Sequence, residues 1–263
     1  MTLGNVGGPY AVSHIPVESH PNIVWHWEDD FDTVERKKVE GWLTEVNGAV
    51  EATLGEYPFE MHFHIYRRNN SREPVPWANT RRNDRQGVNF HIDPTYPLQS
   101  FLNDWTAPHE ISHLSIPYLG RNFAWFAEGY ASFMQYQIME RLGIYTNDQL
   151  SEKYAGKLER VKPFYDRDKD FVTVARELQK RHRYSDMYWG GASFFLNLDD
   201  SLKRMHDISL TELIQEYLTC CRMEDDTLEE VIDSWDRIIG GTACSELLNS
   251  YRTEPASEVL EMF

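Results

Sequence analysis

The sequence predicts an α+β protein, with a small N-terminal lobe that carries a sheet and a larger helical C-terminal lobe. Short segments of alternating apolar and polar residues lie within the first hundred positions, whereas later apolar residues recur at helical spacing. Strands that precede helices in this way are typical of α+β folds. The chain of 263 residues, 41% hydrophobic and 13% aromatic, is long enough for one compact domain with a substantial core.

The N-terminal part divides into two segments. Residues 1–21 contain Gly, Pro, Ser and His without periodicity, which predicts an extended arm. Residues 22–97 are expected to form the sheet-bearing lobe, with a helix over 34–53 that Asp32 or Thr33 caps. The expected strands cover 22–28, 59–66 and 87–93, and a polar, arginine-rich loop separates the last two.

Helical patterns dominate residues 98–263, the predicted helical lobe. Pro117 and Gly120 separate the first two helices as a stop and a turn. The cleft where the two lobes meet is the expected site. The expected helices cover 98–116, 122–142, 148–160, 170–181, 188–206, 209–221, 227–239 and 243–252.

Composition excludes several classes of function. The net charge is −16, from 26 basic and 42 acidic residues, and it disfavours nucleic acid and anionic membranes as partners. No segment approaches the roughly 20 apolar residues of a membrane span, and the N-terminus lacks the features of a signal peptide. We therefore expect a soluble protein, cytoplasmic as given or extracytoplasmic if a signal was removed; its oligomeric state stays open. Three cysteines, Cys220, Cys221 and Cys244, favour neither a disulfide framework nor a cysteine metal site.

The most specific motif is His109-Glu110-Ile111-Ser112-His113, an HExxH. On a helix, positions i and i+4 share one face, so both imidazoles can reach one cation while Glu110 lies beside it. A catalytic zinc ion keeps one coordination position for water and lowers the pKa of that water towards ~7. Glu110 could take the proton and pass it to the leaving amine. The alternative is a helix with two ordinary, partly buried histidines.

Glu128 is the candidate third ligand. It lies within the otherwise apolar run Trp125-Phe126-Ala127-Glu128-Gly129-Tyr130-Ala131, in the next predicted helix. A carboxylate in such surroundings loses hydration unless a cation compensates it, and a zinc ion would do so. The alternative, a solvent-facing Glu128, fits poorly with Ala124 and Ala131 at helical spacing.

HEISH followed by WFAEGYA resembles the gluzincin metallopeptidases, nearest the aminopeptidase N and glycyl aminopeptidase families. The likeness covers roughly residues 98–252. It implies a thermolysin-like catalytic domain with one catalytic zinc ion between the two lobes, held by His109, His113 and Glu128, and a peptide or protein substrate. These families also carry a Y-x-K-G motif whose tyrosine supports the oxyanion, and Tyr188-Trp189-Gly190-Gly191 stands at the corresponding place.

The sequence departs from the family pattern at several points. Only 14 residues, 114–127, separate His113 from Glu128, so the link must turn tightly. Gly190 replaces the motif's lysine, and the Gly-Ala-Met-Glu-Asn box that grips a substrate's amino end is absent. Pro108 directly before His109 requires the helix to begin near Thr106 or to kink there.

Tyr188 is the first candidate for an oxyanion donor, since a phenol beside the metal can hydrogen-bond developing negative charge. Tyr184 lies four residues earlier on the same expected face, and His182 could serve instead. A core tyrosine on an aromatic helix is the alternative for Tyr188.

Three further features have weaker functional interpretations. The strand containing Gly87, Val88 and Asn89 could pair with an extended peptide, as the edge strand of gluzincins does, or be an ordinary sheet strand. His62 and His64 share a strand face but have no apparent third ligand. The arginines of the polar loop could clamp an anionic substrate group or simply pair with an acidic surface.

The sequence thus predicts a zinc-dependent peptidase with Glu110 as general base, aminopeptidase-like in its resemblance. A zinc endopeptidase of the same clan is the alternative among enzymes, favoured by the absent amino-binding box. A zinc-stabilised protein that binds peptides without cleaving them is the alternative from another class. The intact Glu110 argues against it, because a structural metal site needs no base.

Overall fold

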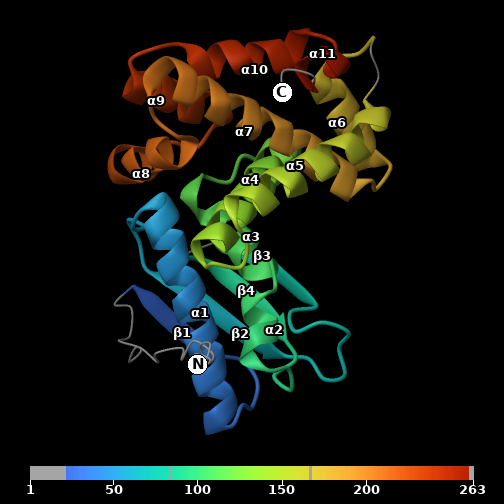
Figure 1. The fold of residues 1–263 in the computed structure, drawn as a ribbon. Coiled ribbons are helices and arrows are strands. Elements are labelled where there is room, and N and C mark those ends of the chain that lie inside the picture. The colour runs from blue at the N-terminus through green and yellow to red at the C-terminus, as the bar shows by residue number, and fades with distance from the viewer. Residues whose placement is uncertain (1–21, 83–84, 166–167, 261–263) are drawn as a thin grey trace, which may run out of the picture.

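The computed structural model describes residues 22–82, 85–165 and 168–260 (Figure 1). Its single sheet is mixed, with the strand order β1-β2-β4-β3. The first three strands in that order run parallel, and β3 pairs antiparallel with β4 at the edge. The strands are β1 (Ile23–Trp27), β2 (Met61–Arg67), β3 (Trp77–Arg82) and β4 (Gln86–Ile92).

Helix α1 (Thr33–Leu54) covers one face of this sheet (Figure 1). Asp32 caps it as predicted: its carboxylate accepts the backbone N–H groups of Val34 and Glu35, while the Glu35 side chain accepts the Asp32 N–H. The buried indole of Trp42 packs against Phe90 with ring centroids 5.6 Å apart. Apolar burial of this kind holds the helix on the sheet.

The prediction of a loop across the arginine-rich segment was wrong, because strand β3 lies within it. Ala78 is the buried residue of β3, whereas Trp77 is 55% exposed, so the segment lacks the apolar alternation that marks a half-buried strand. The strand forms because it pairs with β4, and no side-chain pattern in the sequence predicts that pairing.

The predicted helix over 98–116 is divided into three parts: α2 (Leu98–Leu102), α3 (Thr106–Ser112) and a short 3₁₀ turn (His113–Ser115). The Asp104 carboxylate accepts the backbone N–H of Thr106 at 2.8 Å, and a new helix begins there. Pro108 consequently lies in the first turn of α3, where its missing N–H costs no helical hydrogen bond.

The remaining helices form a bundle beyond the sheet-bearing end of the molecule (Figure 1). The other predicted helices are confirmed to within a few residues, and α11 is an addition. The helices are α4 (Ala124–Arg141), α5 (Asn147–Val161), α6 (Phe171–Lys180), α7 (Tyr184–His206), α8 (Leu210–Cys220), α9 (Leu228–Ile239), α10 (Ala243–Thr253) and α11 (Ala256–Leu260), with 3₁₀ turns at Arg121–Phe123 and Lys162–Phe164.

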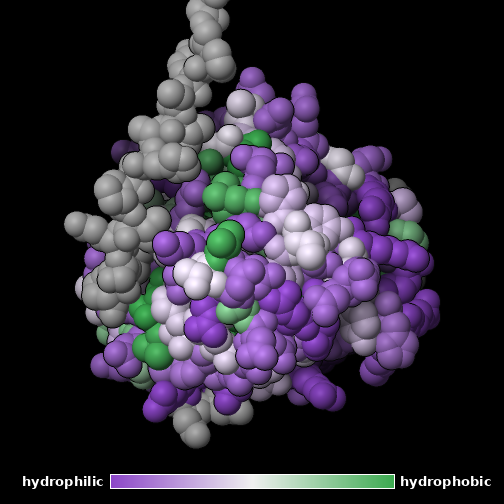
Figure 2. Space-filling model, turned by 90° about the horizontal axis from the view of Figure 1, so that it is seen from below, coloured by the Kyte–Doolittle hydropathy of each residue, from purple (hydrophilic) through white to green (hydrophobic). Residues whose placement is uncertain are grey.

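The predicted arm over 1–21 lies outside the described residues, and a lobe boundary at residues 97–98 stays a prediction. Among the described helices, none is both long and apolar enough to cross a bilayer. Viewed from the sheet-bearing end, the described surface is mostly hydrophilic, with small separate hydrophobic groups (Figure 2).

One disulfide joins the adjacent residues Cys220 and Cys221, while Cys244 is free and buried. The cysteine count had pointed away from a disulfide framework. A bond between sequence neighbours cross-links no distant segments, so it forms no such framework.

Candidate metal centre

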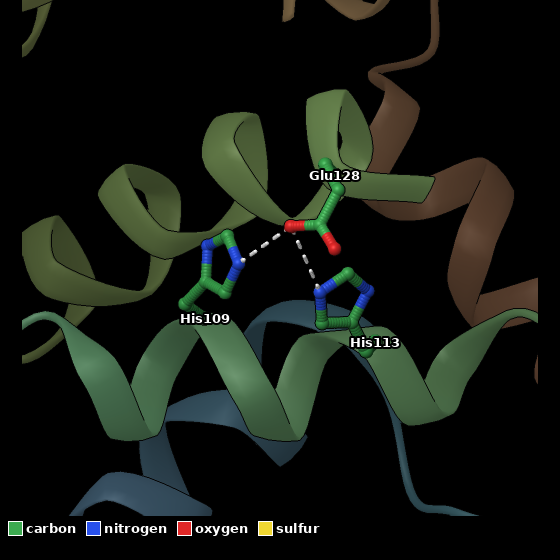
Figure 3. A group of neighbouring side chains, drawn as sticks. All are labelled: His109, His113 and Glu128. Carbon is green, nitrogen blue, oxygen red and sulfur yellow. Dashed lines mark hydrogen bonds and ion pairs between the residues drawn. The ribbon is translucent and has the colours of Figure 1, made fainter. Parts of the chain in front are cut away.

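Three side chains from two helices converge on one point (Figure 3). His109 and His113 project from the α3 segment, which comprises α3 and the 3₁₀ turn that follows it (residues 106–115). Glu128 projects from the facing helix α4. Glu128 Oε2 lies 3.4 Å from His109 Nε2 and 3.7 Å from His113 Nε2. One ligand atom from each residue lies within 4.8 Å of the others. Among the described residues, no other group of three His, Cys, Asp or Glu side chains converges in this way.

The donor set fits a zinc ion. Two imidazoles and one carboxylate are a common set for catalytic zinc. His109 Nδ1 and Gln135 Oε1 are 2.9 Å apart, so the ring donates its Nδ1–H to the amide oxygen and keeps Nε2 free for an ion. Burial alone would raise the pKa of Glu128, but the attraction of His113 and His109 outweighs it and lowers that pKa. The pocket thus favours the anionic form of the Glu128 carboxylate.

Close packing of α4 against α7 positions Glu128. A Cβ atom on Gly129 would lie 2.3 Å from the carbonyl carbon of Gly191, and one on Gly191 would lie 2.0 Å from the Trp125 carbonyl oxygen. Only glycine fits at both places, so the two backbones touch one residue beyond Glu128. Tyr188 lies three residues before Gly191 and is thereby brought to the same end of the site.

The substitution of glycine for the motif lysine also has a physical reason. A Cβ atom on Gly190 would lie 1.6 Å from the hydroxyl oxygen of Tyr165. The buried Tyr165 ring fills the space that a longer side chain would need.

Glu110 points towards the edge strand. Its Oε2 accepts a hydrogen bond from the Thr80 hydroxyl on β3 at 2.9 Å. Residue 80 belongs to the segment predicted as a loop, so the sequence analysis missed it. No sequence pattern marks this position, because it depends on the pairing of β3 with β4, which places Thr80 opposite Val88.

The three candidates for an oxyanion donor differ in their surroundings. Tyr188 is half-buried, its ring centroid is 6.4 Å from that of His109, and burial together with the charges of Glu128 and Glu110 raises its pKa. Tyr184 is 43% exposed, and its hydroxyl lies 2.9 Å from His182 Nδ1. Of the three, Tyr188 is therefore the one whose electrostatic surroundings include Glu110 and Glu128.

The C-terminal end of the α3 segment is held by side chains from outside the helix. Tyr57 Oη donates to the Ile111 carbonyl at 2.9 Å, and Arg222 Nε donates to the Leu114 carbonyl at 2.9 Å. The Arg82 guanidinium donates to the carbonyls of His113 and Ile116. Burial lowers the pKa of Arg82 to about 10. These donors satisfy carbonyls that a longer helix would use itself, so α3 can end at Ser112 and the chain can turn within the short link to Glu128.

Of the two alternatives for residues 87–92, a strand that pairs with a peptide or an ordinary sheet strand, the structure agrees with the ordinary sheet strand. Strand β4 pairs with β2 on one side and β3 on the other, so Gly87, Val88 and Asn89 offer no free backbone edge to a peptide. A Cβ atom on Gly87 would lie 2.0 Å from the His62 carbonyl oxygen, and Val88 is fully buried. Strand β3 is the edge next to Glu110.

The remaining candidates lie apart from the triad. His62 Nδ1 is 2.9 Å from His26 Nε2 on β1, and His64 Nδ1 is 2.5 Å from a carboxylate oxygen of Glu28, which directly follows β1. Arg67 pairs with Glu35. A cavity of about 490 Å³ is lined by α5 residues together with Lys162, Leu196 and Leu260, and none of the three converging side chains lines it.

These features, a mixed sheet with an antiparallel edge strand and two facing helices that carry His, His and Glu, form a fold similar to that of solved aminopeptidase N family and M1 zinc metallopeptidase structures. The chain is similar to an aminopeptidase N family protein from Idiomarina loihiensis, with 16% identity and a TM-score of 0.64 over 91% of this chain and 46% of that one. It is also similar to an M1 zinc metallopeptidase from Deinococcus radiodurans in a form bound to a Tyr-Ser-Ala substrate. The identity there is 14% and the TM-score 0.53, over 86% of this chain and 46% of that one.

A two-domain M1 zinc metallopeptidase bound to L-arginine gives 12% identity and a TM-score of 0.50 over 90% of this chain and 49% of that one. The chain therefore spans about half the length of these structures. No protein-family model and no curated protein matches the sequence.

Proposed function

We propose that the protein is a zinc-dependent peptidase. The observation that carries this proposal is the convergence of His109, His113 and Glu128 within 4.8 Å, with Glu110 beside the first histidine. A zinc ion held there would polarise the scissile carbonyl and lower the pKa of a water molecule. The similarity to M1 zinc metallopeptidase structures supports the same reaction class.

The chain's own residues would perform three tasks. Glu110 takes a proton from the attacking water through the carboxylate oxygen that Thr80 leaves free, and then delivers it to the leaving amine. Tyr188 keeps its phenolic proton, because its pKa is raised, and donates a hydrogen bond to the developing oxyanion. Gln135 fixes the tautomer of His109.

We place the substrate backbone along β3. Strand β3 is one of the two outer strands of the sheet, and its Thr80 contacts Glu110, so an extended peptide added at this edge would pass the base. This placement replaces the one along residues 87–89. It provides backbone contacts that do not depend on the substrate's side chains.

Aminopeptidase-like cleavage is the preferred version, because the similar structures include an aminopeptidase N family protein. Endopeptidase cleavage is the alternative. On β3, the side chains that share the face of Thr80 are those of Ala78 and Arg82, neither of which is a carboxylate that could bind a substrate ammonium group. Paired peptides that differ only in N-terminal acetylation separate the two versions: an aminopeptidase cleaves the free peptide alone, and an endopeptidase cleaves both.

A non-catalytic, zinc-stabilised peptide-binding protein is the second candidate. The Gly190 substitution and the short link after His113 favoured it, but Tyr165 and the capped α3 end supply structural reasons for both. Metal-stripped and zinc-reloaded protein, assayed on a mixed peptide library, tests the choice. Zinc-dependent cleavage supports the peptidase. Peptide binding by the zinc-loaded protein with no cleavage of any library member contradicts it.

A further inference from the structure

The disulfide between Cys220 and Cys221 lies one residue from a contact with the α3 segment, which carries the proposed zinc ligands His109 and His113. Arg222 follows the disulfide directly and is 5% exposed. Its Nε donates to the carbonyl of Leu114, the residue after the ligand His113, at 2.9 Å. The sequence separation between these partners is 108 residues, so the contact joins the end of α8 to the end of the α3 segment.

The disulfide sits where it can control the position of Arg222. The backbone N–H groups of Cys221 and Arg222 both donate to the Tyr217 carbonyl at 3.0 Å, and the Cys221 carbonyl accepts the Glu224 N–H at 2.9 Å. The bond removes rotational freedom from both cysteine side chains and from the peptide between them. An arginine attached to a constrained backbone needs less ordering to reach Leu114.

The two cysteine residues also differ in exposure. Cys220 is exposed and Cys221 is 8% exposed, so an external thiol can attack the outer sulfur while the inner one leaves. Cys244 is buried, and burial raises the pKa of its thiol, so it is a poor competitor for this exchange.

We propose that Cys220 and Cys221 form a redox site that controls, through Arg222, how firmly the end of the α3 segment is held. The co-reactant is a dithiol. Its first thiolate attacks Cys220, its second thiol resolves the mixed disulfide, and two electrons and two protons pass to the protein. The products are two cysteine thiols and the oxidised dithiol. Reduction frees the backbone at Arg222 and loosens the hydrogen bond that holds the carbonyl next to His113. The part of this inference that concerns regulation of the metal centre rests on the proposed function.

Counting thiols tests the bond itself. Unfolded protein without reductant is expected to show one thiol, that of Cys244, and three after reduction with tris(2-carboxyethyl)phosphine. Three thiols before reduction overturn the proposal.

Hydrogen exchange on metal-free protein tests the coupling without any need for zinc. Reduction is expected to speed exchange in residues 111–116 by about tenfold, a sign of more frequent local opening, and to leave β4 unchanged. In the variant Cys220→Ser, at an exposed position, residues 111–116 are expected to exchange quickly without reductant, and added reductant is expected to leave their exchange rates unchanged. Equal exchange rates in oxidised and reduced wild-type protein overturn the proposal.

Zinc release to a chelator is the second readout. Weakened support for a ligand typically costs about 10–100-fold in metal affinity, so reduced wild-type protein is expected to release zinc several-fold faster than oxidised protein. Release rates equal within twofold contradict control of the metal centre. If neither form binds zinc, the proposed function fails, while the exchange experiment still decides whether the disulfide controls residues 111–116.

Discussion

Gly129 and Gly191 bring helices α4 and α7 into backbone contact, because neither position has room for a Cβ atom. Glu128, the proposed third ligand, directly precedes Gly129, and Tyr188 lies one turn before Gly191. The glycine contact thereby helps to set the distance between the proposed ligand Glu128 and the proposed oxyanion donor Tyr188. This crossing requires Gly129 of the WFAEGYA segment and Gly191 of the YWGG segment, whereas Gly190 makes room for Tyr165.

Gly191→Ala is expected to lower the free energy of unfolding by about 1–3 kcal/mol or more, since the new methyl group meets the Trp125 carbonyl. It is also expected to weaken zinc binding by displacing Glu128. Gly156→Ala is the matched control, because that helical glycine on α5 has no atom within 4 Å of an added Cβ and is expected to gain about 0.5–1 kcal/mol. Chemical denaturation measures both. Equal stability of the two variants would refute the close crossing.

Gln135→Leu is expected to reduce zinc affinity by about 10–100-fold, because His109 loses the acceptor that fixes its tautomer. Competition with a chromogenic chelator measures the affinity. Gln137→Leu on the same helix is the control, since Gln137 donates to Tyr154 instead of a proposed ligand. Identical zinc affinities in the two variants would remove Gln135 from its role.

Thr80→Val is expected to lower kcat by about 10–100-fold with KM and zinc content unchanged, which corresponds to loss of a hydrogen bond to a charged group. The isosteric valine removes only the hydroxyl that orients Glu110. Thr80→Ser keeps the hydroxyl and is expected to recover most of the rate. Steady-state kinetics on one peptide substrate decides: if the serine variant is as slow as the valine variant, Thr80 acts through packing.

Glu110→Gln is expected to retain zinc and lose turnover by at least about 10²–10⁴-fold, because the amide cannot accept the water's proton. Zinc content by atomic spectroscopy and cleavage of an unblocked peptide provide the two readouts. Retained turnover in a zinc-loaded variant would exclude Glu110 as the base.

The sequence was sufficient for features that depend on local pattern. Helix α1 and its Asp32 cap follow from apolar spacing and cap chemistry, and the HExxH spacing by itself places His109 and His113 on one helix face. The WFAEGYA run pointed to Glu128 because a lone carboxylate in apolar surroundings needs compensation.

Features that depend on distant pairing could not be predicted. Strand β3 forms by pairing with β4, so neither the true edge strand nor the contact of Thr80 with Glu110 was visible in the sequence. The early end of the α3 segment depends on Arg222, which is 108 residues away from Leu114. The odd number of cysteines offered no reason to expect the bond between Cys220 and Cys221.

The most direct measurement is a crystal structure of zinc-loaded protein with anomalous data collected at the zinc edge. We expect one strong peak about 2.0–2.2 Å from Nε2 of His109, Nε2 of His113 and a carboxylate oxygen of Glu128. A peak elsewhere, or a Glu128 carboxylate turned away from both rings, would contradict the metal centre and with it the peptidase.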